Sequence, residues 1–346
     1  MEKVLQKSEE QIVSDLITSY SLSQIIYVCA KLGVFDVLAE GEKSSEELAA
    51  IVQAHPGTLY RFLRGLACTG LLQEERKNVF ALTSRGRHLL SDDPRSLYMG
   101  ALMCGEEQYR AWGEALYTAK TGKPAFDHIY GVPAFDYLSL QSAAGQVFHA
   151  TMASSAARER AAVLATYDFS ACEKIIDVGG GDGTLIASLL QRYPGLRGAL
   201  FDLSAVVEKA EQTLQTYGVT DRCDVISGNF FESIPAHYTV YIFSRVLHDW
   251  DDEHALKILQ KCRESIPCHA RILIIERIMP DHPIHGGEVD RSTFKAIMND
   301  LNVLIMTGGR ERSSEDFAGL LIEAGFRLAR TLSTTYATSI LEGFPV

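Results

Sequence analysis

The residues best suited to chemistry lie in a glycine-rich turn within positions 174–185 of the 346-residue chain. An apolar strand ends in Asp177, and Gly179, Gly181 and Gly183 follow before a helix with apolar periodicity begins. Glycines allow a backbone to approach a ligand closely, and the first amides of a helix point toward the same crevice. The turn is therefore typical of a site for a nucleotide-like cofactor.

Two cofactor classes compete for this turn. A dinucleotide fingerprint expects glycine at position 184, where Thr184 stands, and gains nothing from Asp177 beside a diphosphate. S-adenosylmethionine carries no phosphate and presents a cationic ammonium, which suits the acid. Asp202, at the end of the next expected strand, is placed to bind ribose hydroxyls, and Leu203 follows it. The sequence therefore favours S-adenosylmethionine, with S-adenosylhomocysteine as product, over a nicotinamide cofactor.

A candidate base, His248, follows the fourth expected strand within Ser244–Asp252. Ligands of open α/β sheets bind at the carboxyl ends of the strands, so His248 and Asp249 are expected over the cofactor crevice. A phenol with a pKa near ~10 is mostly protonated at neutral pH, and histidine titrates in the range that a base for methyl transfer needs. The alternative is a histidine that only caps a helix or packs in the core. Position and acidic neighbours favour His248 as the general base.

Two further carboxylates are candidates to orient the imidazole. Glu276 closes the fifth expected strand, and Glu311 lies in the segment 308–312. A carboxylate against a histidine fixes its tautomer and raises its basicity, although each acid also fits a solvated strand end or a loop salt bridge. Asn299 and Asp300 are the only hint of oxygen ligands for a metal, and as neighbours on one expected helix they should point apart. We expect no metal cofactor.

The wall of an acceptor pocket is expected from apolar and aromatic side chains before the glycine turn and on a late helix. Met298, Asn302 and Met306 are successive helical turns apart and share a face, although such a face is also typical of core packing. The proposed wall consists of Trp112, Phe148, Met152, Met298, Asn302 and Met306. It suits a flat, mostly apolar small molecule such as an aromatic ring.

Alternating strand and helix patterns from residue 171 onward predict a doubly wound α/β sheet. Strands are expected at 174–177, 198–202, 224–227, 240–243 and 271–275, followed by a closing hairpin at 327–332 and 336–341. Residues 1–103 predict short amphipathic helices and then a two-stranded wing, which is the order of a winged helix. Residues 104–170 are expected to form an aromatic-rich bridging region, and 171–346 the cofactor domain.

The composition argues against several classes of function. The formal net charge is −11, and the expected recognition helix 58–69 carries only Arg61 and Arg64, so nucleic acid is not an expected partner. Seven cysteines without a Cys-x-x-Cys pair indicate neither a disulfide framework nor a zinc site. No apolar run is expected to reach the ~18 residues of a membrane span, which predicts a cytoplasmic protein without a membrane partner. The apolar segment 25–35 instead suggests a subunit interface.

Together these motifs resemble those of the caffeate and acetylserotonin O-methyltransferases, a family that depends on S-adenosylmethionine. The resemblance spans nearly the whole chain and rests on Leu32–Asp36, Thr83–Gly86, Tyr130–Pro133, Asp177–Gly181, Phe201–Asp202, Gly228–Phe231, Arg245–Trp250, Glu276 and Gly308–Arg312. It implies a Rossmann-like class I methyltransferase sheet and an N-terminal winged-helix dimerisation domain. It also implies a homodimer that methylates a hydroxyl of a small aromatic molecule, with the histidine as base.

The resemblance adds contacts to the cofactor. Positions that match Asn229 and Phe230 contact the adenine, and those that match Arg245 and Trp250 lie beside the cofactor. The full expected set is Asp177, Gly179, Gly181, Gly183, Asp202, Leu203, Asn229, Phe230, Ser244, Arg245 and Trp250. The family usually has Asp where Asn229 stands, so one acceptor is exchanged for a donor. The alternatives are a relative that uses the cofactor for another reaction, a nicotinamide-dependent oxidoreductase and a ligand-sensing regulator.

Overall fold

The structure, a computed structural model, describes residues 8–93, 96–140, 142–280 and 289–346. Contacts along the backbone divide the chain into two compact units. The first comprises residues 1–113 and 132–155, and the second comprises residues 114–131 and 156–346. The expected bridging region 104–170 is therefore shared between the two units.

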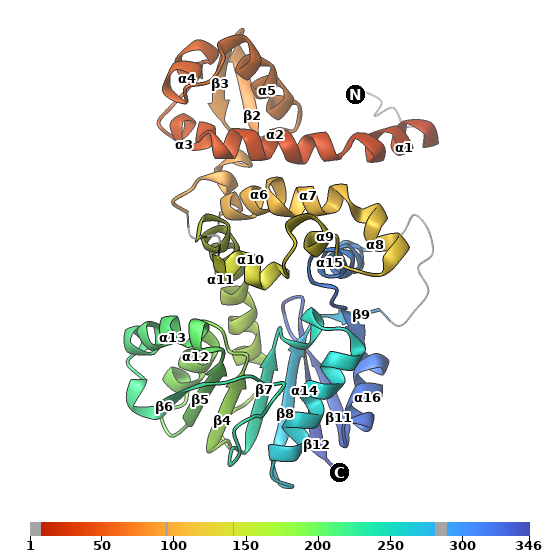
Figure 1. The fold of residues 1–346 in the computed structure, drawn as a ribbon. Helices are drawn as coiled ribbons and strands as arrows, with labels where there is room; N and C mark the ends of the chain where they lie inside the picture. The colour runs from red at the N-terminus through yellow and green to blue at the C-terminus, as the bar shows by residue number, and fades with distance from the viewer. Residues whose placement is uncertain (1–7, 94–95, 141, 281–288) are drawn as a thin grey trace, which may run out of the picture. The chain divides into compact units, whose positions relative to one another are not determined.

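The second unit contains a seven-stranded sheet in the order β11-β12-β8-β7-β4-β5-β6 (Figure 1). The five strands from β6 to β8 are parallel, whereas β12 runs antiparallel to both β8 and β11. The expected doubly wound sheet and closing hairpin are thus confirmed. The strands are β4 (Lys174–Val178), β5 (Arg197–Asp202), β6 (Cys223–Ser227), β7 (Val240–Ser244), β8 (Arg271–Glu276), β11 (Phe326–Ser333) and β12 (Ser339–Pro345).

Helices cover both faces of this sheet, because its central strands are apolar on both sides. One face packs against α12, α13 and the end of α11, and the other packs against α14 and α16. The helix α14 begins at an acidic N-cap, where the Asp251 side chain accepts the N–H of His254. The bounds are α11 (Ser142–Thr166), α12 (Thr184–Arg192), α13 (Ser204–Tyr217), α14 (Asp252–Ser265) and α16 (Ser314–Glu323).

Smaller elements of the second unit gather near α15 (Arg291–Thr307), which contacts α8 (Ala115–Thr121) and α9 (Ala125–Tyr130). The short strands β9 (Ile278–Met279) and β10 (Arg312–Ser313) pair in parallel. This pairing brings the segment that follows α15 next to the end of β8. Two single turns complete the unit, η2 (Thr220–Arg222) and η3 (Leu247–Asp249).

The first unit has the predicted winged-helix order, with a small sheet in the order β1-β3-β2. Its core includes Phe35, Leu63 and Phe80, all of which are buried. The elements are α1 (Glu9–Thr18), α2 (Tyr20–Lys31), α3 (Val34–Ala39), β1 (Lys43–Ser44), α4 (Ser45–Ile51), α5 (Pro56–Cys68), β2 (Leu72–Arg76), β3 (Val79–Leu82), η1 (Gly86–Leu89), α6 (Tyr98–Gly105), α7 (Glu107–Gly113) and α10 (Ala134–Leu140).

The run Glu9–Lys31, formed by α1 and α2, is long and apolar enough by length and composition to cross a membrane. The expectation that no run reaches this length is therefore wrong. Apolar side chains of α1 remain exposed, namely Ile12, Val13, Leu16 and Ile17. Membrane spans, signal sequences and core helices of soluble proteins all contain runs of this length and composition.

Candidate active site

The glycine turn joins the carboxyl end of β4 to the N-terminus of α12. Gly179, Gly181 and Gly183 have φ values of 71°, 60° and 75°, a left-handed backbone that side chains other than glycine rarely adopt. A Cβ atom at Gly179 would lie 2.8 Å from Val246, whereas one at Gly181 would meet open space. The turn is therefore held against the segment that follows β7 on one side and is open on the other, as a ligand cradle requires.

Asp177 lies under this turn and is 1% exposed. Within the described part of the chain, neither of its carboxylate oxygens has a hydrogen-bond partner. Burial, with help from Asp202 and Asp182, raises the pKa of Asp177 to about 7. A buried carboxylate without partners is costly, so this group fits a cationic ligand such as the ammonium of S-adenosylmethionine.

Asp202 ends β5 beside the same turn. Its Oδ2 accepts the N–H of Gly181 at 2.8 Å, and its Oδ1 accepts the N–H of Leu203 at 2.7 Å. Burial raises the pKa of Asp202, and the two backbone N–H groups oppose that shift. Each oxygen keeps a further lone pair, so the carboxylate is oriented and still able to accept two hydroxyl groups, as a ribose diol offers.

The expected adenine side is built by an aromatic group after β6 and β7. The rings of Phe230 and Trp250 meet edge-on with centroids 6.0 Å apart. The Oδ1 atom of Asn229 accepts the N–H of Phe231 at 3.0 Å, and its Nδ2 donates to Glu232 at 3.2 Å. The amide that replaces the family's usual Asp is therefore engaged in its own turn. Ser244 is the last residue of β7.

His248 lies in η3, directly after β7, and is buried. Its Nδ1 is 3.2 Å from Oε1 and 3.0 Å from Oε2 of Glu276, and its Nε2 is 3.2 Å from Oδ1 of Asp249. Burial and the guanidinium of Arg245 lower the pKa of His248, but Asp249 and Glu276 outweigh them and leave it raised. The imidazole is thus held between two carboxylates at the carboxyl edge of the sheet.

Glu276 is fully buried at the end of β8 and also accepts the N–H of Leu247 at 3.0 Å. Burial favours the neutral acid, but His248 and Arg245 overcome this and hold the pKa of Glu276 below its ordinary value. Of the two acids considered for orienting the imidazole, Glu276 is therefore the one that contacts it, at Nδ1. Its hydrogen bond to Nδ1 selects the tautomer whose lone pair lies on Nε2.

Glu311 contacts Arg245 and Asn299, and no hydrogen bond joins it to His248 in the described structure. Its Oε1 accepts hydrogen bonds from Arg245 at 3.4 Å and from Asn299 at 2.6 Å. Arg245, which the family resemblance places beside the cofactor, bridges Glu311 and Glu276, the latter at 3.1 Å. Its backbone is left-handed, with φ 57°, which directs the side chain toward these acids.

The side chains of Asn299 and Asp300 both contact Glu311 and do not point apart. Asn299 donates to the side chain of Glu311, and Asp300 accepts the N–H of Glu311 at 2.9 Å. The expectation from helix spacing is wrong because the loop after α15 folds back over both positions. Among the described residues, no group of three His, Cys, Asp or Glu side chains is arranged to hold a metal ion.

Comparison with known proteins assigns the family. A family model described as an O-methyltransferase domain matches residues 111–327, and one described as an O-methyltransferase dimerisation domain matches residues 14–92. The chain belongs to the O-methyltransferase family. Phenazine O-methyltransferase PhzM of Lysobacter antibioticus is 38% identical over 97% of this chain and 96% of its own length. The solved mitomycin 7-O-methyltransferase MmcR is 33% identical, with a TM-score of 0.90 over 97% of this chain and 98% of its own.

Two further relatives concern the cofactor and the acceptor atom. The O-methyltransferase NcsB1 of neocarzinostatin biosynthesis was solved with S-adenosylmethionine and 2-hydroxy-5-methyl naphthoic acid. It is 28% identical, with a TM-score of 0.85 over 98% of this chain and 99% of its own. Phenazine-1-carboxylate N-methyltransferase of Pseudomonas aeruginosa is 28% identical over 94% of both proteins. The chain is an S-adenosylmethionine-dependent O-methyltransferase of the secondary-metabolite type, with N-methyltransferases among its relatives.

The expected acceptor wall of the methyltransferase is only partly described. Met298, Asn302 and Met306 follow one another along α15, and each is at least partly exposed. Trp112 lies on α7 in the first unit. The side chains of Phe148 and Met152, on α11, lie outside the described part of the structure.

Two residues near the site were not anticipated. Glu159 on α11 is 8% exposed. Burial and Glu276 raise the pKa of Glu159 more than Arg245, Arg277 and His248 lower it. Between Arg158 and Arg160, Glu159 gives no signal in the sequence other than that of a solvated helix face. The second residue is Arg312. It lies in the segment 308–312 beside Glu311, but the sequence predicts no role for it.

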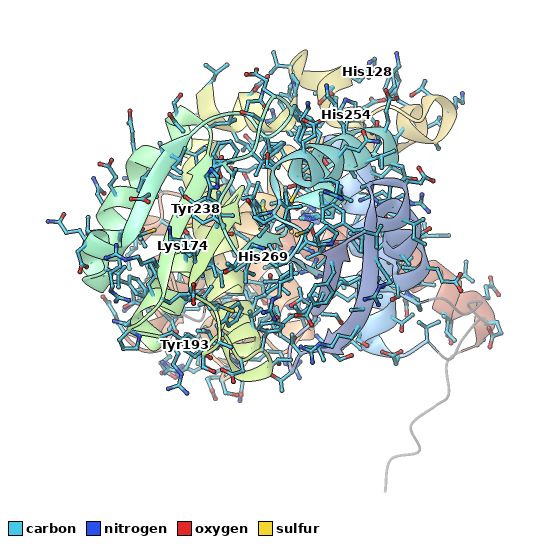
Figure 2. All side chains as sticks on the ribbon, turned by 90° about the horizontal axis from the view of Figure 1, so that it is seen from below. His128, Lys174, Tyr193, Tyr238, His254 and His269 are labelled. Atoms are coloured by element: carbon cyan, nitrogen blue, oxygen red, sulfur yellow. The ribbon has the colours of Figure 1, made fainter. Side chains whose placement is uncertain are left out.

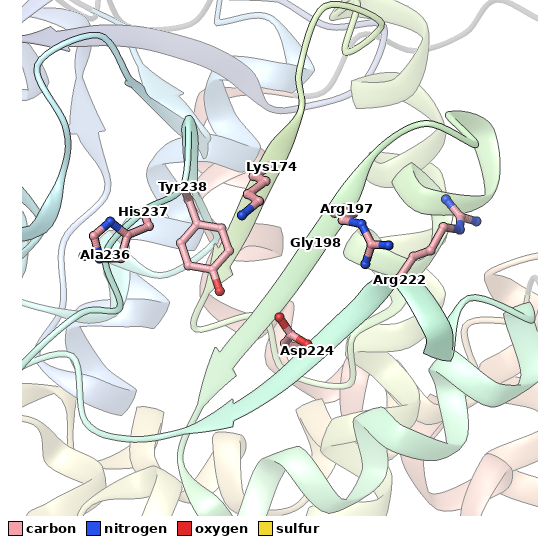
Figure 3. Close-up of a pocket in the computed structure, with 8 residues that line it drawn as sticks. All are labelled: Lys174, Arg197, Gly198, Arg222, Asp224, Ala236, His237 and Tyr238. Carbon is pink, nitrogen blue, oxygen red and sulfur yellow. The ribbon is translucent and has the colours of Figure 1, made fainter.

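A pocket of about 350 Å³ lies at the opposite edge of the sheet, where the strands begin. It is lined by residues that include Lys174, Arg197, Asp224 and Tyr238, and the hydroxyl of Tyr238 points toward Asp224 (Figure 3). Figure 2, seen from below, shows Lys174, Tyr238 and His269 on this side. Because Asp177 and His248 lie at the carboxyl ends of their strands, this pocket is separate from the group of residues described above.

Proposed function

We propose that this methyltransferase methylates a phenolic hydroxyl of a small aromatic natural product, with His248 as the general base. The observation that carries the proposal is the buried imidazole, whose Nδ1 contacts Glu276 within 3.2 Å at the sheet edge that also holds Asp177 and Asp202. Bound S-adenosylmethionine supplies an electrophilic methyl group to this edge. Asp177, Gly181 and Asp202 fit its ammonium and ribose.

The chain's own groups then move one proton. The Nε2 of His248 takes the proton of the acceptor hydroxyl, and Glu276 stabilises the imidazolium while it keeps the ring oriented. In the described structure Nε2 lies against Asp249. The acceptor hydroxyl therefore takes the place of this carboxylate at Nε2, or shares it, when it binds. Arg245 opposes premature protonation of the base, because its charge lowers the pKa of His248.

Names of relatives support an aromatic acceptor, since they include phenazine and hydroxynaphthoate chemistry. The exposed apolar side chains of α1 and the matched dimerisation domain support a homodimer through the N-terminal unit. We place the domain boundaries near residues 103 and 170. We also propose that the protein works in the cytoplasm, without a metal, nucleic acid or a membrane. Thr184 stands where a dinucleotide fingerprint expects glycine, which speaks against a nicotinamide cofactor.

A labelled-donor screen tests the proposal. The protein is incubated with S-adenosylmethionine labelled in its methyl group and with matched pairs of phenols and aromatic amines. We expect label in the phenols, attached to oxygen as judged by NMR of the product. Transfer to the amines alone would indicate N-methylation, and a melting temperature raised by NAD but not by S-adenosylmethionine would indicate an oxidoreductase.

A further inference from the structure

Arg312 is a fully buried arginine that binds the backbone on both sides of His248. Its Nη1 donates to the carbonyl of Leu247 at 2.7 Å, and its Nη2 donates to the carbonyl of Trp250 at 2.8 Å. Its Nε donates to Oδ1 of Asp252 at 2.9 Å, and Nη1 also reaches the carbonyl of Arg310 at 3.3 Å. The side chain is 0% exposed. One planar group therefore spans the turn from residue 247 to residue 252.

The backbone before Arg312 holds the carbonyl of His248, which the guanidinium does not bind. The N–H of Arg310 donates to the carbonyl of His248 at 2.8 Å. A Cβ atom at Gly309 would lie 2.2 Å from the same carbonyl oxygen, so only glycine allows this approach. The segment 309–312 thus engages the carbonyls of Leu247, His248 and Trp250 together.

Stabilising a loop with a buried guanidinium carries a desolvation cost. A buried guanidinium loses its hydration, and the carboxylate that forms an ion pair with Arg312, that of Asp252, has a side chain that is 51% exposed. Apolar packing would fill the same space without that desolvation cost. What the guanidinium supplies is direction, because its rigid fork fixes several acceptors relative to one another, which a lysine ammonium cannot do.

We propose that Arg312 is a positioning residue for methyl transfer, which holds the turn 247–250 so that His248 keeps Glu276 on Nδ1 and presents Nε2 to the acceptor. This inference rests on the proposed role of His248 as the base. Arg312 itself touches neither the acceptor nor the cofactor. Its effect is transmitted through the backbone of the residues that flank His248.

Arg312→Lys tests the inference, because lysine retains the charge and loses the fork. We expect kcat to fall ~10–100-fold, as small misplacements of a catalytic group do, with KM and the Kd of S-adenosylhomocysteine changed less than about threefold. The acid limb of the kcat profile should also move to lower pH, because a loosened His248 loses part of the influence of Asp249 and Glu276 that raises its pKa.

Arg263→Lys is the matched control. Arg263 also binds two carbonyls, those of Gly325 at 3.0 Å and Val346 at 2.7 Å, but at the far end of α14. It should lower the melting temperature and leave kcat and the pH profile unchanged. Equal kcat losses in the two variants, or a normal kcat and pH profile for Arg312→Lys, would overturn the inference.

Two further variants keep the outcomes distinguishable. If Arg312→Lys does not fold, Arg312→Gln, which retains two donors, is measured in its place with the same expectations. His248→Ala tests the proposed function separately, since near-normal turnover in that variant removes the base itself. An inactive His248→Ala with an unaffected Arg312→Lys contradicts only the positioning role.

Discussion

Asp177 offers the sharpest test of the cofactor site, because its carboxylate is buried without a hydrogen-bond partner among the described residues and its pKa is raised to about 7. If the ammonium of S-adenosylmethionine is the missing partner, binding requires the ionised carboxylate. Binding should therefore release a proton whenever Asp177 is protonated beforehand. The affinity should rise with pH up to neutrality.

The magnitude follows from the ionised fraction. With a pKa of about 7, Asp177 is half ionised at pH 7 and roughly 3% ionised at pH 5.5, so the Kd should weaken roughly sixteenfold, or about 1.6 kcal/mol, over this range. The α-amino group of the cofactor, with a pKa of about 8, stays protonated throughout. The same shift has an opposite effect on the free protein. Its stability should fall as the pH rises from about 4 to about 7, because the native state holds this proton longer than the unfolded chain does.

Calorimetry at pH 5.5 and 7.0, each in two buffers with different ionisation enthalpies, measures both the Kd and the protons released. We expect roughly half a proton at pH 7 and close to one at pH 5.5. Asp177→Asn should bind weakly at pH 7 and lose both the proton release and most of the pH dependence. A Kd that changes less than twofold between the two pH values, without proton release, would refute the assignment of Asp177 to the ammonium.

Three other predictions concern the remaining groups. His248→Ala should lower kcat ~10²–10⁴-fold at pH 7 and leave the Kd of S-adenosylhomocysteine nearly intact, and kcat should partly recover as the pH rises toward the pKa of the phenol. Glu276→Gln should lose less activity. Near-normal turnover of His248→Ala would exclude His248 as the base. Asp202→Ala should weaken cofactor binding about tenfold to a hundredfold by calorimetry, since charge-assisted hydrogen bonds to the ribose are lost, and an unchanged affinity would contradict the ribose assignment. Turnover should persist in a chelator, and loss that added Mg²⁺ restores would show that a metal takes part.

The parts of the site that follow from local rules could be predicted from the sequence. The glycine turn requires left-handed backbone at fixed positions, and all three of its glycines have it. A parallel sheet brings the carboxyl ends of its strands to one edge, which predicts that Asp177, Asp202 and the segment after β7 lie together. The hairpin of β11 and β12 was also indicated by its strand patterns.

The parts that depend on long-range packing could not be predicted. The sequence favours Glu276, at the end of an expected strand, over Glu311 in a loop, but only the fold decides which one contacts His248. Arg245 was expected beside the cofactor, and its hydrogen bonds to Glu276 and Glu311, made from a left-handed backbone, were not predicted. Backbone of this kind at a residue other than glycine gives no pattern that a reader of the sequence can detect.

Charge balance around His248 links these residues. The groups that act on one another there include four carboxylates, on Glu159, Asp249, Glu276 and Glu311, and two guanidiniums, on Arg245 and Arg277. When all four carboxylates are ionised, these surroundings are net negative even if His248 carries a proton. Such a site favours a cationic donor and an imidazolium, and it disfavours an acceptor that arrives already ionised. A phenol must then enter as the neutral hydroxyl and lose its proton inside the site, which is the circumstance in which a buried base is needed.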